Sequence, residues 1–266
     1  MTNWRSYDRI AGRYDVVWGT RFEAVARHMW ALMPPAAGAI VLDIGTGTGI
    51  VPRSLGARVD QLAAVIGCDR SAGMLSMAKK AMPNLRVLVA EATALPFRQS
   101  NFEIVTASFV LSHLVNYRAA LLEAYRVLRP AGALVVTSWS ANTDPYSRAW
   151  SELLAEAVSK ERLQEAVAQV APSEDYFEKG ESVKTALTAA GFAGVEVHTI
   201  ALECSLPIDS YIADRELSSG GRLAQDVLGP DGWRRFAARA REELQRSFGS
   251  HFEYSRGAHI GLGHRE

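Results

Sequence analysis

Three glycines at alternating positions follow an apolar run in the segment VLDIGTGTG, residues 41–49. They are Gly45, Gly47 and Gly49, and Asp43 stands just before them. Glycine lacks Cβ and adopts positive φ without steric cost, so a turn of this composition lets a ligand approach bare backbone. The pattern predicts a nucleotide-type binding site at the carboxyl end of a buried strand.

The spacing of the glycines narrows the kind of nucleotide. A dinucleotide fingerprint, G-x-G-x-x-G, would need its last glycine where Ile50 stands. A phosphate loop would end in Gly-Lys-Ser or Gly-Lys-Thr, and no such ending follows. The loop therefore argues against an NAD-linked site and against a phosphate loop.

Residues 7–139 carry further motifs and resemble class I S-adenosylmethionine-dependent methyltransferases. The match is to the small-molecule branch related to the ubiquinone and menaquinone C-methyltransferases. Beside the glycine loop, the motifs are Y-D-x-x-A-x-x-Y-D over residues 7–15, GCDRSAGML over 67–75 and AEATALPF over 90–97. The resemblance implies S-adenosylmethionine as cofactor, and a mostly parallel, seven-stranded, Rossmann-like sheet with helical cap insertions.

Asp69 stands about 20 residues beyond the glycine loop, where an acid binds ribose hydroxyls in doubly wound folds. Glu91 stands where relatives usually carry the aspartate that receives the adenine amino group, and Met74 is either an adenine contact or core. Together with these, the resemblance implies a cofactor-binding set of Tyr14, Asp43, Gly45, Thr46, Gly47, Gly49, Asp69, Arg70, Met74, Glu91, Ala92 and Ser108.

His113 is the candidate catalytic residue. It follows the expected strand over 102–108, and an imidazole with a pKa near neutrality can remove a proton from an acceptor. The alternative is a structural histidine bonded to a nearby carbonyl. We expect a substrate pocket formed by Tyr7, Trp18, His113, Trp139 and Tyr146. Further aromatic residues could wall it or belong to the core: Trp4, Trp150, Tyr176 and Phe177.

The elements that must position these residues alternate between apolar runs and helix-period segments, which predicts an α/β fold with a doubly wound, parallel sheet. We expect strands over 39–44, 62–68, 85–90, 102–108, 133–139, 195–202 and 252–262. The expected helices cover 50–57, 71–81, 117–128, 144–170, 181–190 and 210–248, the last broken at Gly220-Gly221 and at Gly229-Pro230. The prediction is a single domain, 1–266, with a lid at 1–30 and cap segments at 140–190 and 207–249.

The amino-acid composition of the chain limits the kinds of partner and cellular location that we expect for it. Lys plus Arg and Asp plus Glu number 29 each, so no net field favours nucleic acid or an anionic membrane surface. No stretch approaches ~20 apolar residues, and the first 15 lack a signal-peptide core, so we expect a cytoplasmic protein. Its two cysteines are expected to be reduced and buried. We expect no metal site, and a solvated helix face for the arginine-rich stretch 222–246.

These features predict a methyltransferase that moves a methyl group from S-adenosylmethionine, by in-line displacement, to an O, N or C atom of a small, partly apolar molecule. One alternative is a cyclase or isomerase of a biosynthetic pathway that keeps the cofactor as a structural element. Another is a non-enzymatic protein with a vestigial pocket. The acceptor and the oligomeric state stay open at this point, a homodimer included.

Overall fold

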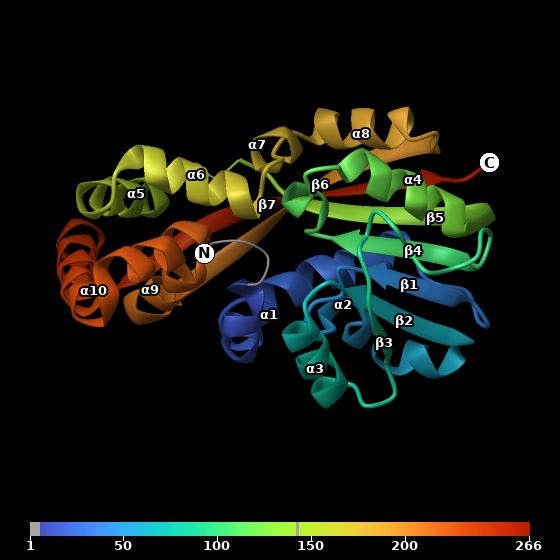
Figure 1. The fold of residues 1–266 in the computed structure, drawn as a ribbon, viewed down its shortest axis with the longest axis horizontal. Helices are drawn as coiled ribbons and strands as arrows, with labels where there is room; N and C mark the ends of the chain where they lie inside the picture. The colour runs from blue at the N-terminus through green and yellow to red at the C-terminus, as the bar shows by residue number, and fades with distance from the viewer. Residues whose placement is uncertain (1–5, 142–143) are drawn as a thin grey trace.

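The computed structural model describes residues 6–141 and 144–266. Trp4 and the first five residues of the predicted lid lie outside this range. In the described chain one seven-stranded sheet forms, with the strand order β3-β2-β1-β4-β5-β7-β6 (Figure 1). β1 (Ile40–Ile44), β2 (Ala64–Asp69), β3 (Arg86–Val89), β4 (Phe102–Ser108) and β5 (Leu128–Trp139) are parallel, as predicted. β7 (His251–His264) runs antiparallel to β5 and to β6 (Ala193–Pro207).

Helices cover both faces of the sheet because successive strand residues point to opposite sides. Val41 packs in the apolar cluster with α1 (Ser6–Leu32), α2 (Ile50–Arg53) and α3 (Ala72–Ala81). Leu42 packs in the cluster with α4 (Tyr117–Val127) and α8 (Gly180–Ala189). Figure 1 shows the two helix layers on either side of the strands. The doubly wound, Rossmann-like fold is therefore confirmed.

Local boundaries depart from the sequence prediction in the first half. The helix expected over 50–57 ends at Arg53, and a 3-10 helix, η1, covers Gly56–Gln61. Residues 129–132 belong to the start of β5, where Ala131 adopts a φ of 61° and the pairing with β4 shifts register. Cys68 and Cys204 are both free and buried. No helix of the described residues has the length and apolar character needed to cross a bilayer.

Strands β6 and β7 continue well beyond the rest of the sheet. β5 pairs with β7 only between residues 258 and 264, whereas β6 and β7 stay paired as far as Pro207 and His251. The predicted strands 195–202 and 252–262 are therefore too short. Residues 201–207 and 251–257 form a two-stranded ribbon, and one of its faces is buried through Leu202, Cys204 and Phe252.

A helical cap packs around this ribbon (Figure 1). It contains α5 (Pro145–Ala157), α6 (Lys160–Val170), α9 (Ile208–Leu217) and α10 (Ser219–Phe248), while α7 (Glu174–Phe177) leads back to the sheet. Its apolar cluster centres on Trp150, Tyr211, Trp233, Phe236 and Phe252. The single helix expected over 144–170 is two helices, because Ser159 caps a new one.

The second cap segment also divides at a capping serine. The break lies at Ser218, not at Gly220-Gly221, since Ser218 accepts a hydrogen bond from the Gly221 amide as the N-cap of α10. The expected break at Gly229-Pro230 is present, because Gly229 adopts a φ of 67° inside α10.

Candidate functional site

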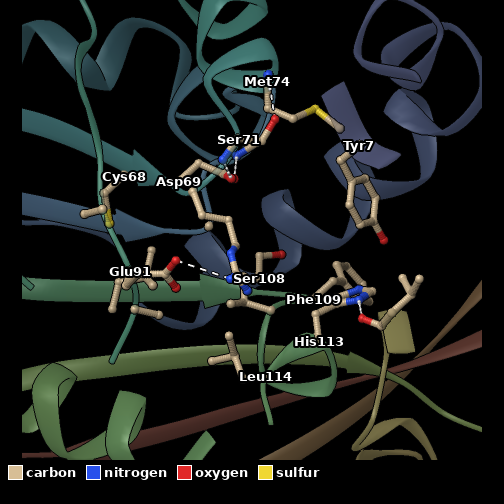
Figure 2. A pocket seen from close by; sticks show the side chains of 18 of the residues that line it. Tyr7, Cys68, Asp69, Ser71, Met74, Glu91, Ser108, Phe109, His113 and Leu114 are labelled. Carbon is tan, nitrogen blue, oxygen red and sulfur yellow. Dashed lines mark hydrogen bonds and ion pairs between the residues drawn. The ribbon is translucent and has the colours of Figure 1, made fainter. Parts of the chain in front are cut away.

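A cavity lies at the carboxyl ends of β1, β2 and β4, where the strand order reverses and open α/β sheets bind ligands (Figure 2). Eleven of the predicted site residues line it: Tyr7, Tyr14, Gly45, Gly47, Asp69, Arg70, Met74, Glu91, Ala92, Ser108 and His113. Its remaining lining was not predicted: Ile44, Cys68, Ser71, Ala90, Phe109, Val110, Leu114 and Val170.

Each of the three glycines in the loop has a different structural role. Gly45 has a φ of 66°, and a Cβ there would meet Val110 Cγ2 at 2.3 Å, so its small size admits Val110. Gly47 has a φ of 55°, and a Cβ there would meet nothing closer than Gly45 O at 3.9 Å. Gly49 is the N-cap of α2 and packs against Ala78 of α3. Gly49 therefore sets helix packing and does not line the cavity.

Asp69 joins the glycine loop to the turn before α3. Its Oδ2 accepts a hydrogen bond from Gly47 N at 2.9 Å, and its Oδ1 accepts one from Ser71 N at 2.8 Å. Burial raises the pKa of Asp69, and the backbone hydrogen bonds from Ser71 and Gly47 oppose that rise. The carboxylate retains further lone pairs on the cavity side, which two vicinal hydroxyls could use.

Asp43 and Thr46 lie beneath the loop instead of lining the cavity, which corrects their predicted role as direct cofactor contacts. Asp43 is 1% exposed, and its Oδ1 accepts a hydrogen bond from Thr106 Oγ1 at 2.6 Å. Burial raises the pKa of Asp43 to about 7. The Thr46 side chain packs against Gly67 of β2. Both residues brace the loop from the sheet side.

Helix α1 is held against the glycine loop and the turn before α3 by the two acids of the amino-terminal motif. Asp8 Oδ1 accepts hydrogen bonds from Ser71 Oγ at 2.6 Å and from Gly73 N at 3.0 Å. Asp15 accepts one from Thr48 Oγ1 and pairs with Arg53 Nη2 at 3.0 Å. These contacts were missed, although the spacing of seven residues places both acids on one face of a helix.

At the other end of the cavity, Arg70 Nη2 pairs with Glu91 Oε1 at 3.3 Å (Figure 2). Met74 is buried on α3, and its amide donates to the N-cap Ser71 Oγ. Ser108 Oγ hydrogen-bonds Thr137 Oγ1 at 2.9 Å, so this hydroxyl is engaged by β5. The end nearest Glu91 therefore combines a carboxylate and a guanidinium, whereas Met74 packs beside Tyr7 and Tyr14 of α1.

The two ring nitrogens of His113 correspond to the two roles considered for it, a structural hydrogen bond and a proton acceptor. Its Nδ1 lies 2.9 Å from Val170 O, and because a carbonyl oxygen only accepts, Nδ1 carries the proton of the neutral ring. Burial lowers the pKa of His113, and the Arg222 charge acts in the same direction. A backbone carbonyl thus orients the ring, while Nε2 is left as an acceptor at the cavity wall.

Three aromatic residues predicted for the substrate pocket do not line this cavity. Trp139 stacks behind Phe109 with ring centroids 4.3 Å apart, and Trp18 donates its indole N–H to Asp214. Tyr146 stacks on Phe252 in the cap, with centroids 4.4 Å apart. The residue that reaches the cavity is Phe109, whose φ of 56° turns the chain sharply after β4.

The lining fits an adenosyl group. Gly47 offers open backbone, Asp69 offers a carboxylate for vicinal hydroxyls, and Met74 and Leu114 offer apolar surface for a base. Among residues 6–141 and 144–266, no three His, Cys, Asp or Glu side chains gather as a metal site would need.

Comparisons with known proteins agree with this geometry. A model of the methyltransferase domain matches residues 42–136. The chain is 31% identical over 205 residues to the demethylmenaquinone methyltransferase of Clavibacter sepedonicus, covering 71% of this chain and 82% of the relative. It is 34% identical over 157 residues to that of Renibacterium salmoninarum, covering 57% of this chain and 65% of the relative.

Among solved structures, phosphoethanolamine N-methyltransferase 2 of Haemonchus contortus in complex with S-adenosylhomocysteine has the same fold. It matches with a TM-score of 0.58 and 17% identity, over 98% of this chain and 60% of that one. The chain belongs to the class I S-adenosylmethionine-dependent methyltransferases, in the branch of the ubiquinone and menaquinone C-methyltransferases. Its cofactor is S-adenosylmethionine. The domain model ends at residue 136, before the cap.

Proposed function

We propose that this enzyme methylates a small, partly apolar ring of the quinol type, at a ring atom made nucleophilic by loss of a neighbouring hydroxyl proton. The proposal is supported by the curated relatives, which are demethylmenaquinone methyltransferases. The observation that carries it is that the backbone of Gly47, held by Asp69, and the acceptor nitrogen of His113 face one cavity. When bound, S-adenosylmethionine supplies an electrophilic methyl group on its sulfonium.

The residues of the chain accelerate the reaction mainly by positioning donor and acceptor, and to a smaller extent by proton transfer. Holding two reactants in register is worth ~7 to 11 kcal/mol, whereas a general base contributes about 10²- to 10⁴-fold in rate. Asp69, Gly47 and the lid contacts of Asp8 and Asp15 fix the donor side. On the acceptor side, a hydroxyl proton moves to His113 Nε2, which leaves an imidazolium and an oxyanion whose electron pair is shared with the ring carbon. Once the ring carbon carries the methyl group, it loses its own proton to water, and the imidazolium returns its proton to the oxygen, which restores the quinol and the neutral imidazole.

The test uses 1,4-naphthoquinol, kept reduced by dithionite, with S-adenosylmethionine labelled with tritium in its methyl group. Transfer predicts label in the organic product and a mass increase of one methyl in place of hydrogen. The oxidised 1,4-naphthoquinone has no hydroxyl proton to lose and should take no label. Failure to label this quinol and a panel of related phenols would refute the proposal. A cyclase or isomerase would leave the label on the cofactor, and no contact described above favours that alternative.

We also infer that the enzyme works in a reducing, cytoplasmic setting. The inference is supported by Cys68 and Cys204, which are buried free thiols. Burial raises the pKa of Cys68 to about 12, so this cavity thiol stays protonated and unreactive. Growth of cells that express a tagged copy, followed by fractionation, would test the location.

A further inference from the structure

Arg222, near the start of α10, differs from the other arginines of its stretch. The predicted solvated face is correct for Arg234, whose side chain is 74% exposed, and for Arg239, whose side chain is 53% exposed. It is wrong for Arg222, which is 5% exposed. A buried guanidinium loses its hydration and is therefore normally paired with a carboxylate.

The described chain satisfies only part of this guanidinium. Nη1 donates to Leu217 O, while Nε and Nη2 are buried and have no hydrogen-bond partner within residues 6–141 and 144–266. No carboxylate of those residues pairs with Arg222, and residues 1–5 and 142–143 contain no acid. The protein therefore presents buried cationic donors without the anion that would balance them.

The Arg222 side chain does not itself line the cavity, but it adjoins the cavity through Tyr7, which does. The Cζ atom of Arg222 is 5.1 Å from the centroid of the Tyr7 ring, and that ring meets His113 edge-on at 5.7 Å. Figure 2 shows Tyr7 and His113 at the end of the cavity away from Cys68 and Glu91. Burial raises the pKa of Tyr7, whereas the charge of Arg222 opposes that rise, which is consistent with a cation close to the phenol.

The acids around this position do not supply the missing anion. Glu174 of α7 acts on the pKa of Tyr7 but forms no ion pair with Arg222. Burial, with the neighbouring charge of Glu178, raises the pKa of Glu174, which makes its ionised form less favourable. Both oxygens of Asp69 already accept backbone hydrogen bonds from the cofactor loops. A ligand oxyanion would complete the site.

We propose that Arg222 binds an oxyanion of the acceptor, so that the enzyme selects acceptors with an ionisable phenol, enol or carboxyl group next to the methylated atom. This inference rests on the proposed function and deepens it. The guanidinium stabilises the oxyanion that forms when a hydroxyl proton passes to His113 Nε2. Its planar fork of donors suits an oxygen anion, and charge-assisted hydrogen bonds are the stronger kind.

The experiment measures binding to the full chain saturated with S-adenosylhomocysteine. The probes are 2-hydroxy-1,4-naphthoquinone, an anion at neutral pH, and 2-methyl-1,4-naphthoquinone, a neutral molecule of similar size. We expect wild type to bind the anion at least about tenfold more tightly. Arg222→Met should abolish this preference and bind the neutral probe within about twofold of wild type. Arg234→Met, on the solvated part of the same helix, should retain the preference.

Three results would overturn the inference. They are equal binding of both probes by wild type, a preference that survives in Arg222→Met, and weaker S-adenosylhomocysteine binding in Arg222→Met with unchanged 5′-methylthioadenosine binding. The last result would assign the guanidinium to the carboxylate of the cofactor. If Arg222→Met does not fold, Arg222→Lys replaces it, since an ammonium lacks the fork and should reduce the preference. Anion preference without methyl transfer to naphthoquinol would refute the proposed reaction and leave this inference standing.

Discussion

The carboxylate of Asp69 holds the backbone amide of Gly47, with Oδ2 and N 2.9 Å apart. One side chain at the end of β2 thereby fixes the loop that follows β1, and its second oxygen fixes Ser71 at the start of α3. The glycine loop, which lines the cavity at Gly45 and Gly47, is held in shape by a residue of the neighbouring strand.

Asp69→Ala should weaken S-adenosylhomocysteine binding by at least about tenfold, because it removes two charge-assisted hydrogen bonds, each worth about 1.5–3 kcal/mol, and the proposed ribose contact. Isothermal titration calorimetry measures the change. Asp60→Ala, at an exposed position of η1, is the matched control and should bind as wild type does. Wild-type affinity in Asp69→Ala would show that the cofactor lies elsewhere.

Gly47→Val should abolish cofactor binding, since its side chain would enter the cavity from a backbone with a φ of 55°. Gly38→Val provides the control, because Gly38 also has a positive φ, 77°, but its Cβ would project into open space. Both variants should lose about 1–2 kcal/mol of stability from backbone strain. Only Gly47→Val should also lose binding, and equal losses of binding in the two would contradict the assignment of the loop.

His113→Asn should lower kcat by about 10²-fold or more while leaving S-adenosylhomocysteine affinity within about twofold, because an amide can still donate to Val170 O but cannot take a proton. In wild type, the neutral ring is the active form. Its pKa is lowered by burial from the usual 6.5, so activity should be level above pH 6.5 and fall only at lower pH.

The effect of His113→Ala on kcat/KM is expected to be smaller than that of Asp69→Ala or Gly47→Val, because donor placement outweighs the base. A pH profile that is unchanged in His113→Asn would assign the histidine to structure alone.

Asp214→Asn should destabilise the folded protein by about 3–5 kcal/mol, because it leaves two guanidinium groups without their counter-charge. Asp214 is 1% exposed and pairs with Arg21 of the lid and Arg215 of the cap. Urea denaturation measures the loss. Asp231→Asn removes an ion pair with Arg234 whose two side chains are each 74% exposed, and it should cost less than about 1 kcal/mol.

The pH dependence of stability offers an independent check on Asp214. Burial alone would raise its pKa, but Arg215 and Arg21 outweigh burial and hold it below the usual 3.8. The folded state thus favours the ionised form, so its contribution is present above pH 3.8 and is lost as the pH falls through the folded pKa. As the pH falls through this range, the free energy of unfolding should therefore decrease more for wild type than for Asp214→Asn.

The first half of the fold was predictable because strands buried on both faces read as continuous apolar runs. Val41 and Leu42 are adjacent apolar residues that serve opposite helix layers, and no amphipathic surface strand would need both. The lengths of β6 and β7 were underestimated because the strands of the ribbon alternate between buried and exposed residues instead of forming continuous apolar runs. Glu203 and Ser205 are exposed while Leu202 and Cys204 are buried, and such alternation over a few residues does not reveal how far a strand continues.

The lining of the cavity was predictable where a residue belongs to a local motif, as Gly47 and Asp69 do. Residues that depend on tertiary packing were not. Phe109 reaches the cavity because a positive φ turns the chain after β4, and nothing in a phenylalanine indicates that conformation. Arg222 carries the same charge as the solvated arginines around it, and only the folded cap buries it.

The ribbon that carries the cap has a consequence for how such enzymes diversify. The cap rests on Phe252 and its neighbours, and not on β1 to β4. The cap also binds α1, since Trp18 and Arg21 both contact Asp214, so a transplant of the cap helices and ribbon tips into a related enzyme would have to carry these two residues with it.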